Sequence, residues 1–423
     1  MRVAAMVYEY PPKIVGGLGT YAAEITRKFV LLENDVSVFT MNDDEGALPT
    51  RELWRGIEIH RPLHIDVSDS LPDVIAEDVR KWGRSGGIQF FSKILVYNYL
   101  SASKIINELV KKEGFKYDIL VAHDWLSIIA GITAKRELGL PLVFHVHSTE
   151  KGRTLGNGSE VVSSIEYRGG QMADLVITVS NAMKDELIEL GFPKNKIKVC
   201  YNGVDPEKYS PNQIDIAKRK EIRRSYGLND DDQMILFIGR LVLVKGADKL
   251  IMAMPHVLKT IPKAKLVIVG LGDMEDHLKS MVKGLKLEET VKFRFEFVSE
   301  EERIAHYAAC DLAVFPSLYE PFGIVALEAM SMEKPVVVGA SGVSGMREIV
   351  ISDGPGQCGY HINPNDPVDI AWGIVSSLQD SNRKLELGKN GRKRVLSSFT
   401  WDIIAMKTLE TYQEVTKGER PRA

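Results

Sequence analysis

The sequence predicts an α/β protein with two domains, each built around a mostly parallel β-sheet. Short apolar runs that are typical of buried parallel strands alternate with helical stretches along the whole chain. Several of these runs end in loops rich in Gly and Pro, as expected where a helix follows a strand directly. The chain has 423 residues, more than one hydrophobic core usually organises. The Asn-Gly pair at residues 202–203 and Pro206 mark the exit from a first domain of residues 1–205.

The first domain is expected to repeat a strand–loop–helix unit. A strand at residues 3–8 leads into a loop that contains Gly16 and Gly17, and an amphipathic helix follows at residues 20–32. The loop lacks a complete G-x-G-x-x-G pattern, so by itself it is only a weak sign of a dinucleotide. Further strand segments are expected at residues 36–39, 57–60, 118–125, 141–148, 174–180 and 197–205.

Two of these strand segments end in polar side chains. Residues 118–125 end with His123-Asp124-Trp125, and residues 141–148 carry His145 and His147. Because a parallel strand places its carboxyl end at the ligand-binding edge of a sheet, Asp124 and His147 are candidates for substrate contact. Asp124 is alternatively the N-cap of the next helix, and both roles can coexist. His145 lies deeper in its strand and is expected to be a core histidine. A loop is expected to follow at residues 150–153.

The stretch from residue 73 to residue 112 is expected to be helical, with a break at the glycines of residues 83–87. Its aromatic and aliphatic residues lie near Lys93 and Lys104, which is also the pattern of a helix on a membrane surface. Apolar residues occupy both of its faces, and this favours a helix packed on a sheet. Contact with a membrane is therefore the minor alternative.

The second domain, expected at residues 206–396, begins with a polar and charged segment. A strand at residues 234–239 ends at Arg240, and Lys245 follows after an apolar loop. Two cations at the carboxyl end of a strand suit a diphosphate, because Arg binds oxygens through a planar fork and Lys acts as a point charge. The alternative is a pair of surface cations. Further strands are expected at residues 265–269, 291–295, 311–314 and 335–339, and helices at residues 366–378, 383–396 and 400–415.

Residues 311–332 are predicted to form a strand, a tight loop and a helix that begins near Ile324. The free N–H groups at this helix start, near Gly323, favour a phosphate. Glu320 in the loop and Glu328 in the helix can both face one crevice, where carboxylates accept hydrogen bonds from sugar and ribose hydroxyls. The alternative is two solvated surface carboxylates, which the apolar residues on both sides make less favourable.

Composition argues against several other classes of protein. The formal net charge is −3, and the lack of a basic excess argues against nucleic acid as a partner. The three cysteines have no metal-ligand spacing and indicate reduced thiols in a cytoplasmic protein. The first residues enter a strand without a signal-peptide pattern, and no apolar run is long enough to span a bilayer. The aspartates at residues 230–232 precede a strand rather than follow one, so we do not expect them to bind a metal.

Residues 320–328 resemble the E-x7-E motif of retaining glycosyltransferases of family four, the GT-B group that includes glycogen synthase and sucrose synthase. Residues 239–246 are similar to the family's G-R-x4-K-G, whose Arg and Lys bind the donor diphosphate. Residues 123–125 look like the H-D-W of glycogen and starch synthases, and His147 matches the family histidine that touches the donor sugar. The glycine loop resembles the one that opens the acceptor domain, although two residues rather than one separate Lys13 from the glycines. These motifs follow the family's order over nearly the whole chain.

The resemblance implies the GT-B fold, in which two Rossmann-like domains face each other across a deep cleft. It assigns the acceptor to the N-terminal domain, residues 1–205, and the nucleotide sugar mainly to the C-terminal domain, residues 206–396. The last segment, residues 397–423, is then expected to be a helix that crosses back to the N-terminal domain.

The resemblance also implies the site residues. Those expected to act in catalysis are His147, Asp124, Glu320, Arg240 and Lys245. Those expected to bind the donor are Lys13, Gly16, Gly17, Arg240, Lys245, Gly272, Phe322, Gly323, Ile324, Val325 and Glu328. Neither a metal nor a cofactor is expected, because the two cations would neutralise the leaving diphosphate.

The function that the resemblance implies is transfer of a hexose, by analogy glucose, from ADP-glucose or UDP-glucose to an α-glucan with retention. A small sugar or a lipid is the alternative acceptor, because residues 150–158 do not follow the glycogen-synthase pattern. Two alternatives come from other classes: a nucleotide-sugar epimerase, which shares the two-domain fold, and a nucleotide-sugar-binding protein without activity. The joint presence of Arg240, Lys245, Glu320 and Glu328 argues against a decayed site.

Overall fold

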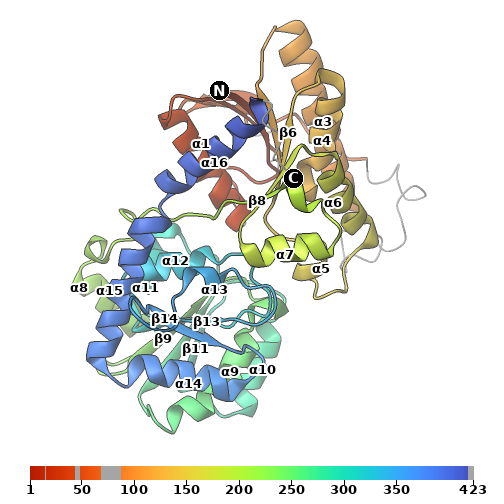
Figure 1. Cartoon of the computed structure of the whole chain (residues 1–423). Coiled ribbons are helices and arrows are strands. Elements are labelled where there is room, and N and C mark those ends of the chain that lie inside the picture. Colours follow the sequence, from red (N-terminus) through yellow and green to blue (C-terminus); the bar gives the residue numbers. More distant parts are fainter. Residues whose placement is uncertain (15, 43–47, 68–86, 418–423) are drawn as a thin grey trace. The chain divides into compact units, whose positions relative to one another are not determined.

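A computed structural model describes residues 1–14, 16–42, 48–67 and 87–417 of the chain (Figure 1). The chain divides into two compact units. Unit 1 is Met1–Tyr201 together with the segment that starts at Trp401, and unit 2 is Asn202–Thr400. Both units are α/β with a largely parallel sheet, which confirms the predicted fold class. The expected arrangement of the units across a cleft stays a prediction.

In unit 1 the described residues form an eight-stranded sheet with the order β3-β4-β2-β1-β5-β6-β7-β8. All neighbouring strands are parallel except β3 and β4, which pair antiparallel at one edge. The strands are β1 (Arg2–Met6), β2 (Asp35–Phe39), β3 (Arg51–Trp54), β4 (Ile57–His60), β5 (Ile119–His123), β6 (Leu142–Val146), β7 (Leu175–Thr178) and β8 (Ile197–Val199).

Among the described residues of unit 1, the helices largely alternate with the strands and end with a helix from the C-terminal segment. They are α1 (Gly17–Leu31), α3 (Gly87–Ser103) with its π-helical continuation η2 (Lys104–Lys112), α4 (Trp125–Leu138), α5 (Glu150–Arg153), α6 (Glu160–Met172), α7 (Asn181–Glu189), the short turn η3 (Lys194–Lys196) and α16 (Trp401–Thr416).

Helix α16 lies beside α1 in Figure 1 and shares the core of unit 1. Its buried face carries Trp401, Ile404 and Tyr412. The ring of Tyr412 contacts the ring of Phe29 at 5.7 Å between centroids, and Trp401 contacts Tyr21 at 5.8 Å. The last helix of the chain is therefore an integral part of unit 1, although some 200 residues of unit 2 precede it.

Unit 2, all of whose residues are described, has a six-stranded parallel sheet with the order β11-β10-β9-β12-β13-β14. Its four inner strands are almost wholly buried, as expected where helices cover both faces of a parallel sheet, and its two edge strands are partly exposed. The strands are β9 (Gln233–Ile238), β10 (Ala264–Val269), β11 (Val291–Arg294), β12 (Leu312–Phe315), β13 (Val336–Gly339) and β14 (Gly359–Ile362).

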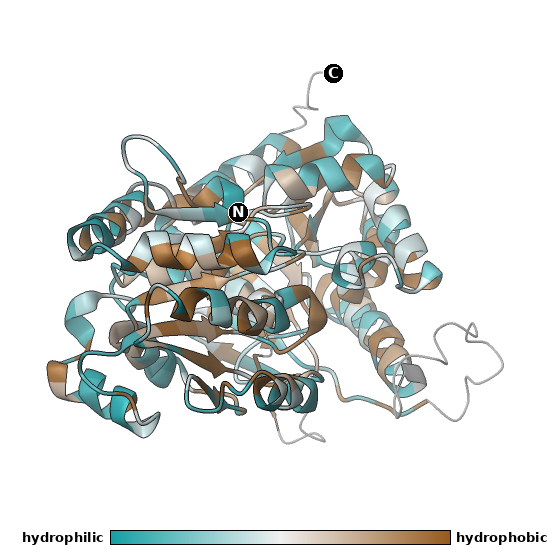
Figure 2. Ribbon diagram, turned by 90° about the horizontal axis from the view of Figure 1, so that it is seen from below, coloured by the Kyte–Doolittle hydropathy of each residue, from teal (hydrophilic) through white to brown (hydrophobic). Residues whose placement is uncertain are grey.

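Figure 2 shows helices that carry both hydrophilic and hydrophobic residues and strands that are largely hydrophobic. In unit 2 the buried apolar residues of the helices and of the strands form one core. The helices are α8 (Ile216–Ser225), α9 (Ala247–Leu258), α10 (Glu275–Gly284), α11 (Glu300–Ala309), α12 (Ile324–Ser331), α13 (Met346–Ile349), α14 (Pro367–Leu378) and α15 (Ser381–Ser398), with the short turns η4 (Pro211–Gln213) and η5 (Leu243–Lys245).

The structure bears on the predicted helix at residues 73–112, of which residues 73–86 lie outside the described part. Phe91, Ile94 and Tyr97 of α3 are buried, and the side-chain amide of Asn98 donates to the backbone carbonyl of Leu126 in α4. One face of the described part of this segment is thus packed in unit 1, whereas Phe90 and Tyr99 are exposed. Among the described residues, no helix combines the length and the apolar character that crossing a bilayer requires.

Three local details differ from the predictions. Residues 150–153 form a helical turn, α5, rather than a loop, because the side chain of Thr149 caps the N–H of Gly152. Helix α1 begins at Gly17 rather than at Thr20. The short edge strand β3 was not expected, since Arg51–Trp54 alternates charged and apolar residues over four positions only.

Candidate active site

In each sheet the order in which strands are added changes direction at one place. The predicted site residues follow the strands at that place. In unit 1 the chain leaves β1 for β2 on one side and later enters β5 on the other side. In unit 2 it leaves β9 for β10 on one side and later enters β12 on the other. Open α/β sheets bind ligands outside the carboxyl ends of the strands at such positions.

In unit 2, Lys245 follows β9 and meets the loop after β12. Its Nζ lies 2.5 Å from Oε2 of Glu320. The backbone of Gly246 explains this approach: its φ is +70°, and a Cβ there would lie 2.1 Å from the carbonyl oxygen of Pro316. Arg240 lies at the carboxyl end of the same strand with an exposed side chain. The structure thus places both predicted cations at the carboxyl edge of the sheet and joins one of them to the predicted carboxylate.

The backbone holds Glu320 in place from both sides. Its N–H donates to the carbonyl of Val343, and its carbonyl accepts from the N–H of Gly345. The Glu320 side chain is buried, and the hydroxyl of Ser317 donates to it at 3.4 Å. A buried carboxylate held in this way has little freedom to turn away from Lys245.

Helix α12 starts directly after this loop, as predicted. Gly323 has a φ of +101°, and a Cβ there would lie 2.6 Å from Cε of Met346. Ile324 and Val325, the first residues of the helix, are partly exposed, so their N–H groups lie near the surface of the unit. The side chain of Phe322, in contrast, is buried and packs on Phe399 at 6.3 Å between ring centroids. Phe322 therefore contributes to the core of unit 2 with its ring.

Glu328 is buried in α12 and already has two partners. Oε2 accepts a hydrogen bond of 2.9 Å from the hydroxyl of Tyr307, and Oε1 lies 3.4 Å from the guanidinium of Arg303. The Glu328 charge raises the pKa of Arg303 above its ordinary value. Arg303 in turn donates to the hydroxyl of Tyr209. Glu320 and Glu328 therefore contact different residues, and Arg303 and Tyr307 are neighbours of the site that sequence patterns did not reveal.

Gly272 follows β10, which pairs with β9 at the same edge of the sheet. A Cβ at Gly272 would lie 2.1 Å from the carbonyl oxygen of Leu241. Gly is required here because the loops after β9 and β10 lie so close together that no side chain fits between them.

In unit 1 the glycine loop leads from β1 to α1. Gly16 is the N-cap residue of α1, its carbonyl accepts from the N–H of Thr20, and no atom of the described residues lies within 4 Å of the place of a Cβ. Gly17 and Lys13 are exposed. The backbone at Gly16 is thus open for close approach by another molecule, whereas Val15 lies outside the described residues.

Asp124 occupies the N-cap position of α4 without capping it. Its carboxylate makes no capping hydrogen bond and instead accepts one of 2.7 Å from the backbone N–H of His147. The backbone at Asp124 has a φ of +55°, an uncommon conformation for a residue other than Gly. Burial raises the pKa of Asp124 to about 6, and the hydrogen bond from His147 opposes this rise. The structure therefore brings Asp124 and His147 together at the ends of β5 and β6.

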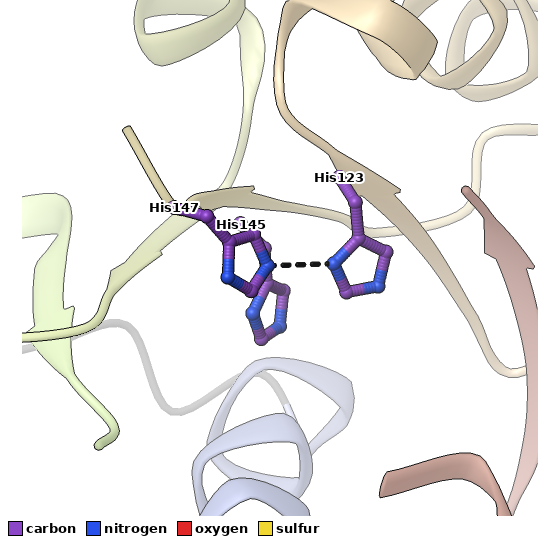
Figure 3. A group of neighbouring side chains, drawn as sticks. All are labelled: His123, His145 and His147. Carbon is purple, nitrogen blue, oxygen red and sulfur yellow. Dashed lines mark hydrogen bonds between the residues drawn. The ribbon is translucent and has the colours of Figure 1, made fainter. Parts of the chain in front are cut away.

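The histidines of β5 and β6 form one cluster (Figure 3). Nδ1 of His123 lies 3.1 Å from Nε2 of His147, and Nε2 of His145 lies 2.7 Å from the hydroxyl of Tyr412. The ring of Tyr21 covers His147, with 4.7 Å between ring centroids. Burial lowers the pKa of His147 to about 3 and holds those of His123 and His145 well below the ordinary range. Of these three histidines the sequence assigned a site role to His147 alone and predicted a core position for His145, whose burial confirms it. Histidines at the ends of two successive predicted strands were the available signal for the cluster.

The fold and these residues define a class of protein with two α/β units. Each unit has a largely parallel sheet, and polar groups gather at the carboxyl edge of that sheet. Comparisons with known proteins narrow this class. The profile named Glycosyltransferase Family 4 matches residues 15–208, and the profile named Glycosyl transferases group 1 matches residues 218–394. The chain belongs to the GT-B glycosyltransferases, with a family 4 first half and a group 1 second half.

Individual relatives agree with this assignment. An uncharacterized glycosyltransferase of Methanocaldococcus jannaschii is 35% identical over 421 residues, which are 98% of each chain. A glycogen synthase of Mycobacterium tuberculosis is 28% identical over 99% of this chain and 96% of its own. Among solved structures, the sucrose-phosphate synthase of Thermosynechococcus elongatus has a TM-score of 0.76 at 22% identity and covers 99% of both chains. The chain is thus a glycosyltransferase related to glycogen synthase.

Proposed function

We propose that the chain transfers glucose, with retention, from ADP-glucose or UDP-glucose to a hydroxyl of an α-glucan. The observation that carries this proposal is the meeting of Lys245 with the Glu320 loop, directly before the N-terminus of α12. This arrangement places a cation, a carboxylate and free N–H groups at one sheet edge. The relation to glycogen synthase supports the choice of glucose and of an α-glucan.

The unit 2 residues act on the leaving diphosphate. Negative charge grows on the β-phosphate as the glycosidic bond breaks. Lys245, Arg240 and the N–H groups of residues 323–325 stabilise this charge, because fixed positive groups need no reorganisation in the transition state. In this proposal no metal is required, since the two cations supply the positive charge.

Glu320, His147 and Asp124 act on the transferred sugar and its acceptor. Glu320 faces the positive charge that develops at the anomeric carbon. His147, which stays neutral at physiological pH, forms a hydrogen bond with a hydroxyl of the sugar. Asp124 fixes the backbone of His147 through their hydrogen bond and approaches the acceptor. With retention, the leaving phosphate takes the acceptor proton from the same face, so no separate base is assigned.

Glu328 is proposed to hold the ribose of the nucleotide. The two contacts to Tyr307 and Arg303 leave lone pairs of the Glu328 carboxylate for the ribose hydroxyls. Gly16 and Gly17 are proposed to bind the donor through their backbone, and Lys13 through its charge. Gly272 is proposed to line the nucleotide base.

The test is a screen of ADP-glucose and UDP-glucose against glycogen, short maltodextrins, monosaccharides and a lipid acceptor. We expect nucleotide diphosphate to be released fastest with an α-glucan, and NMR of the product to show an α-linkage. If release of nucleotide diphosphate depends on a monosaccharide or a lipid instead, the proposed acceptor is wrong and the assignment as a transferase stands. Epimerisation of a nucleotide sugar without any acceptor, or binding without turnover, would overturn the transferase itself.

A further inference from the structure

Three imidazoles gather at the carboxyl ends of β5 and β6, and we propose that they form a binding site for one divalent transition-metal ion of the Zn²⁺ type. His123, His145 and His147 each place one ring nitrogen within 4.8 Å of the others. Within the described residues, this is the one group of three or more His, Cys, Asp or Glu side chains gathered so closely. Figure 3 shows the three rings grouped beside the two strand ends.

The pairing of the strands produces this geometry. His123 and His145 are directly opposite each other in the ladder between β5 and β6, and their rings are 4.7 Å apart. His147 follows β6 and returns toward His123, to an N···N distance of 3.1 Å. Nitrogen ligands about 2.0–2.1 Å from a metal lie roughly 3.0–3.4 Å from each other. Two of the nitrogens are therefore spaced as ligands already, and the third needs to approach by roughly one to two ångströms.

Neighbouring side chains hold the imidazoles. The hydroxyl of Tyr412 contacts Nε2 of His145 at 2.7 Å, so that a bond from this nitrogen to the hydroxyl leaves the other nitrogen to bind an ion. Burial raises the pKa of Tyr412 well above its ordinary value, so the hydroxyl stays neutral. The ring of Tyr21 lies against His147 and limits its rotation. Such supporting contacts around histidine ligands orient the rings and strengthen metal binding.

The chemistry of the ligands selects the ion. Three neutral imidazole nitrogens suit Zn²⁺, Cu²⁺ or Ni²⁺, whereas Mg²⁺ and Ca²⁺ require oxygen ligands. The nearby carboxylate of Asp124 is bonded to the backbone N–H of His147. His123 and His145 are buried, while His147 is partly exposed and gives the ion a route of entry.

An ion in this site would inhibit sugar transfer, and this consequence rests on the proposed function. An ion shared with His123 and His145 would hold the His147 ring against them, so that this ring could no longer turn to the sugar. Binding of the ion does not depend on sugar transfer, so binding and inhibition can be measured separately.

The experiment uses the full chain, freed of metal with a chelator and titrated with Zn²⁺ alone in competition with a chromophoric chelator. We expect one equivalent to bind, and we expect H123Q and H145Q each to weaken binding by about 100-fold or more. H277Q, which removes an exposed histidine of α10, is the matched control and should bind as the wild type does. Y412F keeps all three imidazoles and should weaken binding by about tenfold.

X-ray absorption of the wild-type complex requires no variant and covers the case in which H145Q fails to fold. Three imidazole nitrogens around the ion would support the site. Equal Zn²⁺ affinity of the wild type and H123Q, or an ion with fewer than three imidazole ligands, would overturn it. Zn²⁺ bound at this site without loss of transfer would overturn the role of His147 in the proposed function and leave the metal site standing. Transfer activity without any Zn²⁺ binding would overturn the metal site alone.

Discussion

At the scale of single residues, the contact between Lys245 and Glu320 carries most of the proposed chemistry. Both side chains are largely buried, with 22% and 10% of their surfaces exposed, so that water screens their charges only in part. A diphosphate that enters beside Lys245 would share this cation with Glu320. Glu320 therefore holds the Lys245 ammonium at this edge of the sheet before the donor binds.

Replacing Lys245 by Ala should lower kcat by about a hundredfold or more, because a fixed group that stabilises the leaving diphosphate is lost. Steady-state rates at saturating donor measure this effect. Lys259→Ala, which changes an exposed lysine near the end of α9, is the control and should keep the wild-type rate. Normal turnover of the Lys245→Ala enzyme would refute the assignment.

Glu320 and Glu328 should differ in their kinetic effects, since their partners differ. Glu328→Gln should raise the KM for the donor, because the ribose loses a charged acceptor and Arg303 loses its counter-charge. Glu320→Gln should lower kcat as well, because the carboxylate acts on the reacting sugar. Full kinetics for both variants separate the two effects. Changes in affinity alone in both variants would remove the distinction between the two roles.

The buried carboxyl of Asp124 should make stability depend on pH. Its pKa is about 6 in the folded chain and 3.8 in the unfolded one, so the folded state binds the proton more tightly. The contribution of Asp124 to the free energy of unfolding is therefore fully present below pH 4 and is lost as the pH rises through 6. The change amounts to about 3 kcal/mol.

Asp124→Asn keeps an oxygen for the N–H of His147 and removes the titration. Denaturant titration from pH 4 to pH 7 gives the free energy of unfolding of this variant and of the wild type. The wild type should lose stability relative to the variant as the pH rises through 6. A difference that is constant over this range would contradict the raised pKa.

At the scale of elements, the start of α12 depends on the backbone of Gly323. A residue with a side chain at this position would be strained by the φ of +101°. Its Cβ would also clash with the side chain of Met346. Gly323→Ala should therefore lower the stability of unit 2 by about 1–3 kcal/mol and raise the KM for the donor, because the helix start shifts. Gly284→Ala, in the last turn of α10 with open space around it, should be neutral or stabilise by up to about 1 kcal/mol. Denaturant unfolding of both variants provides the comparison, and equal stability of the two would show that Gly323 is not required.

At the scale of the whole molecule, the chain leaves unit 1 at Tyr201, forms unit 2, and returns to complete unit 1 with α16. Ile404, Ala405 and Tyr412 of α16 are as deeply buried as the residues of the central strands. Unit 1 should therefore be unable to keep its native core without the last segment of the chain.

Deleting residues 401–423 should expose the apolar face of α1 and destabilise unit 1, while unit 2 keeps its fold. Hydrogen exchange followed by mass spectrometry should then show lost protection in β1, β2 and α1 and retained protection in β9 and β12. Ile404→Ala should lower stability by about 2–5 kcal/mol, whereas Met406→Ala, on the exposed face of the same helix, should change it little. Unchanged protection of α1 after the deletion would contradict this view of α16.

Strand positions were the most predictable part of the structure. The strand at residues 57–60 has the predicted bounds, and α12 begins at Ile324 as predicted. Both follow from local patterns, a run of apolar residues or a Gly before a helix-forming segment. The helical turn at residues 150–153 was missed because its stability comes from one capping contact by Thr149 and not from a repeating pattern.

The sequence by itself determined the fold class, the order of the elements and the residue types at the ends of the strands, because these depend on periodicity and on local conformational preferences. Only the tertiary structure decided which of these residues meet. The register between β5 and β6 sets His123 opposite His145, and the close approach of two loops at Gly246 joins Lys245 to Glu320. It also decided that Glu328 is bonded to Tyr307 and Arg303, which lie more than twenty residues before it. Contacts of this kind depend on how strands pair and helices pack across long separations in the chain, and no local pattern contains that information.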